Sequence, residues 1–124
     1  MNVIKRIGII GAAAASLAAA GLSTAPMASA DTANGCTWPR VCFYLTDADW
    51  NSRKPTATYK DITSSPQNLG SRSRNSEWVF NSRNDDGALL YYAHGGTLCL
   101  APNAIVDNND WVVTAIKIMN SPSC

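Results

Sequence analysis

The sequence predicts an all-β domain, a sandwich of two Greek-key motifs, on three observations. Short stretches of β-branched and aromatic residues recur along the chain, separated by turns rich in Gly, Asn and Asp. No segment after the first 30 residues shows the 3.6-residue apolar period of an amphipathic helix. The third observation is internal similarity, because Glu77–Ser82 (Glu-Trp-Val-Phe-Asn-Ser) resembles Asp110–Ala115 (Asp-Trp-Val-Val-Thr-Ala). A unit of about four strands used twice predicts two Greek keys packed face to face.

The N-terminal segment predicts a cleaved signal peptide over residues 1–30. The charged pair Lys5-Arg6 precedes an apolar, Ala-rich stretch at 7–22, and Ala28-Ser29-Ala30 places small residues where signal peptidase needs them. A membrane helix would need about 20 apolar residues followed by a retained domain, and this Ala-rich stretch ends in a cleavage pattern instead. We therefore expect a secreted, extracellular protein.

The mature chain, residues 31–124, has the length of one small domain. Because two basic residues leave with the signal peptide, eight basic and nine acidic residues remain, a net charge of −1. This total provides no long-range attraction to nucleic acid or to an anionic membrane. We expect a monomer that binds no nucleic acid and, after signal cleavage, no membrane.

The first motif is expected over about 36–84. Val41–Leu45 is a strand candidate because its residues suit a pleated surface. Ala57–Lys60 alternates in the manner of a half-exposed strand, and Trp78–Ser82 is the next strand. The segment 64–75 consists largely of Ser, Pro, Asn, Gly and Arg, which predicts a loop.

The second motif is expected over about 87–124, after the turn signal Asn84-Asp85-Asp86-Gly87. Gly, Pro and Asn clusters divide it into short strands. The expected strands are Ala88–Ala93, Thr97–Leu100 and Trp111–Met119, with turns at 94–96, 102–103 and 107–110.

The four cysteines, Cys36, Cys42, Cys99 and Cys124, all lie in the mature chain. An even number in a short exported chain predicts two disulfides, which a small core needs for stability. Four cysteines allow three pairings. We favour Cys36–Cys42 and Cys99–Cys124, because each bond then stays within one copy of the repeat. A structural metal site would want cysteines two to four residues apart in pairs, so no metal is expected.

Three motifs resemble those of secreted bacterial metalloproteinase inhibitors, whose fold is βγ-crystallin-like. The first is the opening Cys36-x5-Cys42-Phe43-Tyr44, in which Pro39 stands at the position of the family's Gly. The others are Asn81-Ser82-Arg83-Asn84 and the segment from Tyr92 through Gly95-Gly96-Thr97-Leu98-Cys99-Leu100-Ala101-Pro102. The resemblance covers nearly all of the mature chain. It implies a βγ-crystallin-like sandwich and inhibition of an extracellular, thermolysin-like protease, without enzymatic activity or a cofactor.

The resemblance also implies where the inhibitory loop lies, although Asn103 stands where the family has a closing Cys. A reactive bond directly after Cys99 would place Leu100 in the large apolar pocket of the protease. The alternative is that Leu98 and Leu100 are core residues on one face of a strand. The implied inhibitory loop consists of Leu98, Cys99, Leu100, Ala101 and Pro102. Whether residues 99–103 project as a loop or lie within a sheet distinguishes an inhibitor from a βγ-crystallin-like binding or toxin-like module that inhibits no protease.

A different class of function stays open, namely a βγ-crystallin-like binding module or a killer-toxin-like module that acts at cell envelopes without inhibiting proteases. Modules of this kind often bind calcium through adjacent acidic or amide residues. Trp78 and Trp111 occupy the second of these positions in the two copies, so any calcium binding should be weak. We expect both indoles to be equivalent buried anchors. His94 is the only histidine of the chain and has no catalytic motif around it, so we expect no enzyme.

Overall fold

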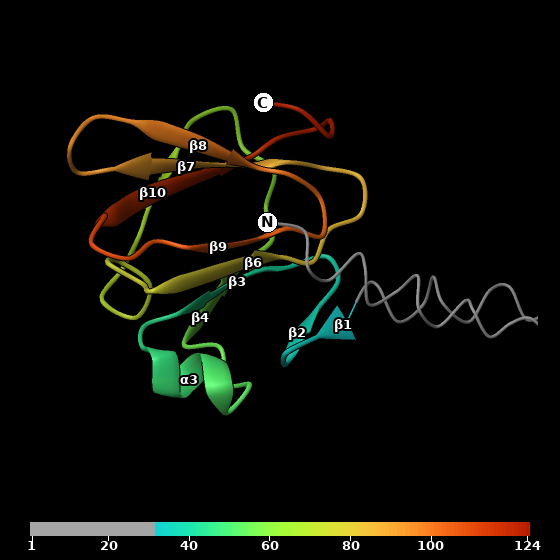
Figure 1. Cartoon of the computed structure of the whole chain (residues 1–124). Helices are drawn as coiled ribbons and strands as arrows, with labels where there is room; N and C mark the ends of the chain where they lie inside the picture. Colours follow the sequence, from blue (N-terminus) through green and yellow to red (C-terminus); the bar gives the residue numbers. More distant parts are fainter. Residues whose placement is uncertain (1–31) are drawn as a thin grey trace, which may run out of the picture.

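A computed structural model describes residues 32–124, and the predicted signal peptide lies outside these residues. The all-β prediction is confirmed, because two four-stranded antiparallel sheets pack against each other (Figure 1). The strands of the first sheet are, in spatial order, β4 (Ala57–Tyr59), β3 (Val41–Tyr44), β6 (Trp78–Asn81) and β9 (Ile105–Asp107). Those of the second are β5 (Gln67–Asn68), β10 (Val113–Ile118), β7 (Ala88–Tyr92) and β8 (Thr97–Leu100).

The two halves of the chain exchange one strand each. β3, β4 and β6 form one sheet, but β5 of the same half pairs with β10 in the other sheet. Correspondingly, β7, β8 and β10 form the second sheet, whereas β9 pairs with β6 in the first. Each sheet therefore contains three strands from one half and an edge strand from the other, and neither half has a complete sheet of its own.

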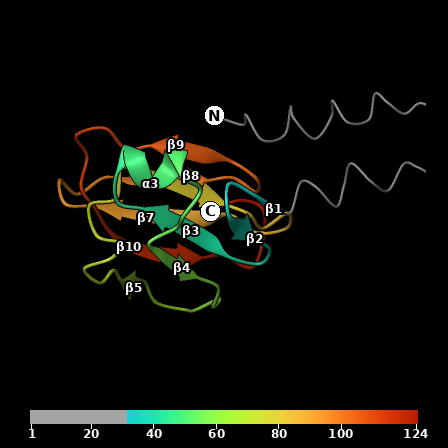
Figure 2. The same cartoon turned by 90° about the horizontal axis from the view of Figure 1, so that it is seen from below.

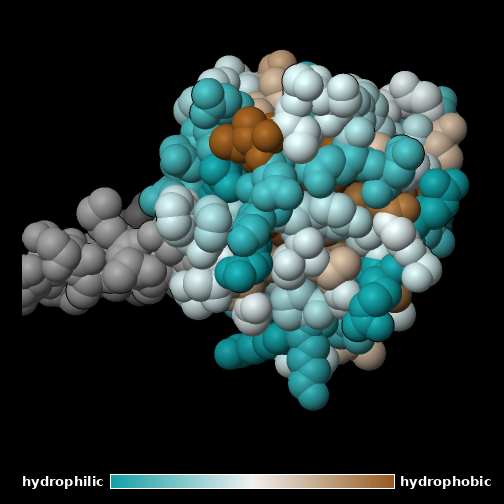
Figure 3. Space-filling model, turned by 180° about the vertical axis from the view of Figure 1, so that it is seen from behind, coloured by the Kyte–Doolittle hydropathy of each residue, from teal (hydrophilic) through white to brown (hydrophobic). Residues whose placement is uncertain are grey.

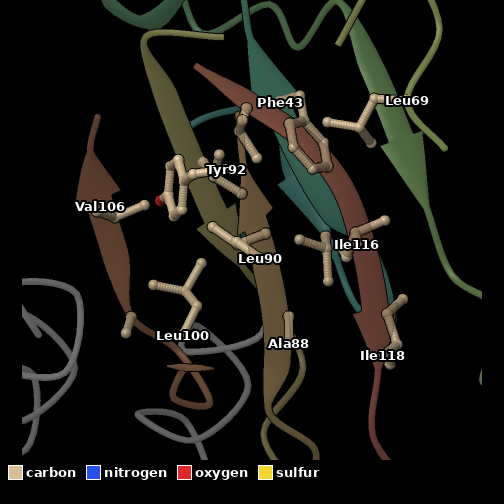
Figure 4. Close-up of a cluster of buried hydrophobic side chains, with 13 residues drawn as sticks. Phe43, Leu69, Ala88, Leu90, Tyr92, Leu100, Val106, Ile116 and Ile118 are labelled. Atoms are coloured by element: carbon tan, nitrogen blue, oxygen red, sulfur yellow. The ribbon is translucent and has the colours of Figure 1, made fainter. Parts of the chain in front are cut away.

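The core lies between the sheets (Figure 4). Strand alternation places Ala88, Leu90 and Tyr92 of β7 on the inner face, opposite Val41 and Phe43 of β3. The remaining buried members are Leu69, Val79, Leu100, Ala104, Val106, Val113, Ile116 and Ile118. The hydrophobic residues thus meet in one continuous cluster to which both sheets contribute.

β3 is buried on both faces, because a second, smaller cluster covers its outer side. Cys36, Cys42, Tyr44, Phe80 and Ile105 form this cluster. The N-terminal hairpin of β1 (Thr32–Ala33) and β2 (Cys36–Thr37) and the helix α3 (Asp47–Asn51) lie on this side of the molecule (Figure 2). Elements outside the two sheets therefore protect the outer face of β3 from solvent.

The short helix α3 was not predicted, because five residues are too few to establish a helical period. It depends on local capping instead. Thr46 Oγ1 accepts a hydrogen bond from the main-chain N–H of Asp49, and the Asp49 carboxylate accepts one from the main-chain N–H of Thr46. This reciprocal box satisfies donors that a helix N-terminus leaves open. The helix carries Trp50 over β3, where the centroid of the Trp50 ring lies 4.8 Å from that of the Tyr44 ring.

Two strands of the sheets were also missed by the sequence patterns. β5 lies inside the segment predicted as a loop, and β9 follows directly after the turn at Pro102-Asn103. Both are two or three residues long and are formed by pairing with the other half. The last strand, β10, begins at Val113, two residues later than Trp111, where the sequence placed its start.

Buried polar side chains join the halves where the chain passes from one to the other. Arg83, which is 6% exposed, donates two hydrogen bonds to the Asp86 carboxylate and one to the carbonyl of Pro39. Asn81 Nδ2 donates to the carbonyls of Asp86 and Leu100. These partners satisfy the buried polar groups, which would otherwise be costly to remove from water.

Candidate functional site

The segment predicted to be an inhibitory loop lies largely within a sheet. Thr97–Leu100 is strand β8, and its alternation turns Leu98 and Leu100 toward the core and Thr97 and Cys99 toward solvent. Leu100 is 3% exposed and belongs to the core cluster (Figure 4). The prediction that its side chain fills a protease pocket is therefore wrong, and the alternative of two core leucines on one face is correct.

The rest of the predicted loop is a tight turn. Ala101 and Pro102 are half-buried, and the main-chain N–H of Ala104 donates to the carbonyl of Ala101. Asn103 adopts a left-handed conformation with φ 62°, and its main-chain N–H donates to the carbonyl of Arg83. These bonds hold the turn against the buried Arg83 region, so it does not project as a free loop.

Both predicted disulfides are present. Cys36–Cys42 closes the N-terminal hairpin against β3, and Cys99–Cys124 joins β8 to the C-terminal segment. The second bond packs on Gly87, because a Cβ atom placed there would lie 3.3 Å from both sulfur atoms and 2.9 Å from the carbonyl oxygen of Pro122. The C-terminal segment therefore fixes the exposed side of β8 at its centre.

β8 has a free edge in the part of the chain that the structure describes, since it pairs only with β7. The main-chain N–H of Tyr92 donates to the carbonyl of Gly96 at the end of the hairpin. This bond determines which residues of β8 form hydrogen-bonded pairs with β7. In an antiparallel ladder, hydrogen-bonded and non-hydrogen-bonded residue pairs alternate. Leu98 and Leu100 consequently bond to β7, while the main-chain groups of Thr97 and Cys99 point to the free edge.

A pocket of about 350 Å³ opens beside this edge, between β8 and β9. Its apolar walls come from one residue on each of three strands, Tyr92, Leu98 and Val106. The polar residues that line it, together with one indole, are Asp107, Asn108, Asn109, Asp110 and Trp111. The pocket thus combines an apolar interior with a rim of carboxylates, amides and an aromatic ring.

Hydrogen bonds fix one wall of this pocket. The Tyr92 hydroxyl donates to Asn108 Oδ1 at 2.6 Å, and Asn108 Nδ2 donates to the carbonyl of Ser76. Burial raises the pKa of the Tyr92 hydroxyl to about 12, because the phenolate would lose solvation. Tyr92 therefore stays a neutral donor, and this wall is preformed.

Trp111 forms the rim and corrects the prediction of two buried, equivalent tryptophans. It is 53% exposed, and it precedes β10, whose pairing with β7 shifts register between Val113 and Ala115. The centroid of its ring lies 5.5 Å from that of the Tyr92 ring and 4.6 Å from that of the His94 ring. Trp78, by contrast, begins β6, is half-buried and pairs with Tyr44. The similarity between the two sequence copies does not extend to the surroundings of their indoles.

His94 reaches Trp111 because of the tight hairpin between β7 and β8. Its imidazole folds over Gly96, where a Cβ atom would lie 2.7 Å from His94 Nε2. The ring also stacks on Tyr92, with centroids 5.7 Å apart. His94 thus belongs to an aromatic cluster with Tyr92 and Trp111.

The pocket side of the molecule carries acidic residues without basic partners. Among residues 32–124, the salt bridges within 4.0 Å are those of Arg83 with Asp85 and Asp86. A hydrogen bond with the Asp107 side chain, together with desolvation and repulsion from Asp107, raises the pKa of Glu77. The hydrogen bond with Asp107 therefore favours the protonated form of Glu77, and among the described residues neither carboxyl group has a basic partner within 4.0 Å.

The described residues contain no candidate metal site and no helix that could span a membrane. Within 32–124, no group of three or more His, Cys, Asp or Glu side chains could hold a metal ion. The helix in this region is far too short to span a bilayer. One face of the molecule is mainly hydrophilic, with hydrophobic residues in small separate spots (Figure 3). The free edge of β8 and the adjoining pocket are two features that a ligand or partner could use.

Comparison with protein-family models, with curated proteins and with solved structures gives no match for this chain.

Sequence reasoning located the β8 segment but missed the pocket. Its walls come from β7, β8 and β9, and the last of these strands was not expected. The available signal was Trp111 directly after the polar turn 107–110, a large aromatic residue beside four acidic or amide residues.

Proposed function

We propose that the chain is a secreted peptidase inhibitor with a βγ-crystallin-like fold, related to the metalloproteinase inhibitors that its motifs resemble. The strand exchange supports two interlocked Greek keys, since each half gives three strands to one sheet and one to the other. The disulfides Cys36–Cys42 and Cys99–Cys124 support an extracellular location. In this proposal the protein is a monomer, uses no cofactor and catalyses no reaction of its own.

The proposed contact with the protease is the edge of β8 rather than the Leu100 side chain. A substrate in a protease cleft is extended and forms main-chain hydrogen bonds, and an exposed sheet edge can form the same bonds. Thr97 and Cys99 offer their main-chain groups at this edge. The observation that carries the proposal is that Cys99–Cys124 fixes this free edge at its centre. A fixed segment loses little conformational entropy on binding.

The test is a titration of thermolysin with the purified mature protein, alongside one serine and one cysteine protease. We expect stoichiometric loss of thermolysin activity. Thr97→Lys should weaken inhibition at least about tenfold, because a lysine on an edge strand opposes pairing. Thr58→Lys is the matched control, an exposed threonine on β4, an edge strand of the other sheet, and should inhibit like the parent.

Two results would contradict the proposal. One is the absence of inhibition of all three proteases at micromolar concentration by protein whose dichroism and melting are normal. The other is equal loss of inhibition in Thr97→Lys and Thr58→Lys, which would show that β8 has no special role.

The second candidate is a binding module of the same fold that inhibits no protease. The preformed pocket with the exposed Trp111 favours it, because an apolar concavity with a few polar groups is the usual form of a ligand site. Binding of a ligand at this pocket, together with the failure of all inhibition assays, would replace the inhibitor by this module.

A further inference from the structure

We propose that the pocket between β8 and β9 binds the lysine side chain of an extended peptide that pairs with the edge of β8. This inference rests on the proposed use of that edge and names the side chain that the partner presents there.

The position of the pocket connects it to the edge. Leu98 belongs to β8 and also lines the pocket, while Val106 and Asp107 line it from β9. β8 and β9 are edge strands of the two facing sheets. A chain added to β8 directs alternate side chains to the inner face of the sheet, the face on which Leu98 lies. Such a side chain would therefore enter the opening between the two edge strands.

The interior of the pocket suits an aliphatic chain. Tyr92, Leu98 and Val106 present apolar surface, and the Tyr92 hydroxyl is already engaged by Asn108. A volume of about 350 Å³ is at the small end of the range for ligand pockets, so it matches a side chain better than a large ligand. Lysine has four methylene groups that can bury against this surface while the ammonium stays at the rim.

The rim determines the charge of the ligand. Asp110 carries a carboxylate at the rim, and no Lys or Arg is among the residues that line the pocket. Trp111 presents an indole that is 53% exposed, and an ammonium group over an indole face is attracted by the ring quadrupole. An acidic side chain would be repelled, and a purely aliphatic one would leave the Asp110 carboxylate without a partner. The lining therefore favours a cation with an aliphatic stem.

The probe is the peptide acetyl-Val-Thr-Lys-Thr-Val-amide, titrated into the full mature protein and followed by amide NMR shifts. We expect shifts at Thr97 and Cys99, whose main-chain groups face the added strand, and at Asp110 and Trp111 on the rim. The same peptide with norleucine in place of lysine should bind about tenfold more weakly, and one with glutamate should not bind, because both lack the ammonium group. Nα-acetyl-lysine amide, which keeps the side-chain ammonium group, should bind the pocket more weakly than the peptide, because it forms no β-ladder.

Variants test the site itself. Trp111→Ala should weaken the lysine peptide about tenfold, and Asp110→Asn about threefold, with a smaller loss at high salt. Trp38→Ala is the matched control, because Trp38 is also exposed, at 45%, and lies outside the pocket lining. Its affinity for the peptide should not change.

Equal affinity for the lysine and norleucine peptides, or unchanged binding by Trp111→Ala, would overturn the proposal. Equal affinity for the peptide and for Nα-acetyl-lysine amide would overturn the placement along β8. These outcomes are separate from the inhibitor assay. Lysine-dependent binding without inhibition of any protease would remove the inhibitor and keep the pocket. If inhibition were unaffected by Trp111→Ala and Asp110→Asn, the inhibitor would be kept and the pocket would have no part in its contact with the protease.

Discussion

Trp78 and Trp111 follow an acidic residue and precede a valine in both copies of the repeat, yet their surroundings differ. Trp78 is half-buried, stacks on Trp50 at 4.8 Å with an interplanar angle of 11°, and donates from Nε1 to Asp47 at 2.6 Å. Trp111 is exposed beside a pocket, and its neighbours are His94 and Tyr92. Trp78 therefore contributes to packing, while Trp111 remains accessible to a ligand.

The difference originates in the hairpins. Between β3 and β4 the chain has room for α3, which supplies both Trp50 and Asp47 to cover Trp78. Between β7 and β8 only residues 93–96 intervene, and their one large side chain is His94. A similar sequence pattern thus gives a half-buried, packed tryptophan where the neighbouring hairpin is long and an exposed one where it is short.

The largest effect should come from truncating the two tryptophans. We expect Trp78→Ala to lower the free energy of unfolding by about 3 kcal/mol, at the low end for a large aromatic residue because Trp78 is half-buried. Trp111→Ala should cost less than about 1 kcal/mol, as an exposed substitution. Urea denaturation of both variants measures the loss in the free energy of unfolding. Equal costs would show that the two indoles share one structural role.

A second comparison uses Tyr92. Tyr92→Phe should cost about 1–2 kcal/mol, because it leaves the buried acceptor Asn108 Oδ1 without its donor. The raised pKa of Tyr92 means that its contribution is complete below pH 10 and is lost as the pH rises toward about 12. Ultraviolet titration should show an ionisation near that pH that Tyr92→Phe removes. Its persistence in the variant would assign it to another residue.

The cover over Trp78 should depend on the helix cap. Thr46→Ala removes the side chain that accepts from Asp49 and should destabilise the fold by about 1 kcal/mol. Because α3 carries Trp50, the same change should raise quenching of tryptophan fluorescence by iodide. Thr58→Ala, an exposed threonine on β4, is the control and should change neither quantity by much. Unchanged stability in Thr46→Ala would show that packing alone holds α3.

The smallest expected effect concerns Glu77, beside Trp78. Its raised pKa means that ionisation is less favourable in the folded protein, so stability falls as the pH rises through that pKa. Glu77→Gln should therefore be more stable at pH 7 by a few tenths of a kcal/mol, because solvent screens much of the interaction of this half-buried surface group with Asp107. The gain should vanish at low pH, where glutamate is protonated. Thermal melts at several pH values measure it, and a gain independent of pH would assign another cause.

The parts of the fold with strong local signals were predictable. The alternating residues of β7, the polar turn at 84–87 and the short spacing of Cys36 and Cys42 each carry their information within a few residues. β5 and β9 do not, because each pairs with the opposite half and is too short for a pattern. Long-range pairing of this kind leaves little trace in local sequence.

The candidate site also has one part that the sequence predicted and one part that it did not. The motif around Cys99 pointed to β8, but its interpretation as a loop failed because a period of two buries Leu100. The exposure of Trp111 could not be foreseen, since it depends on the register shift in β10 and on the short hairpin opposite. Neither feature is encoded next to the tryptophan.

The strand exchange makes the two halves complementary fragments. Both disulfides lie within a half, so a single cut between Asn84 and Asp85 would leave two chains with no covalent link. Each chain would then lack one edge strand that only the other can supply, β9 for one sheet and β5 for the other. Reassembly from the two peptides would have to restore both sheets in one event, and neither half could be transplanted as an independent module.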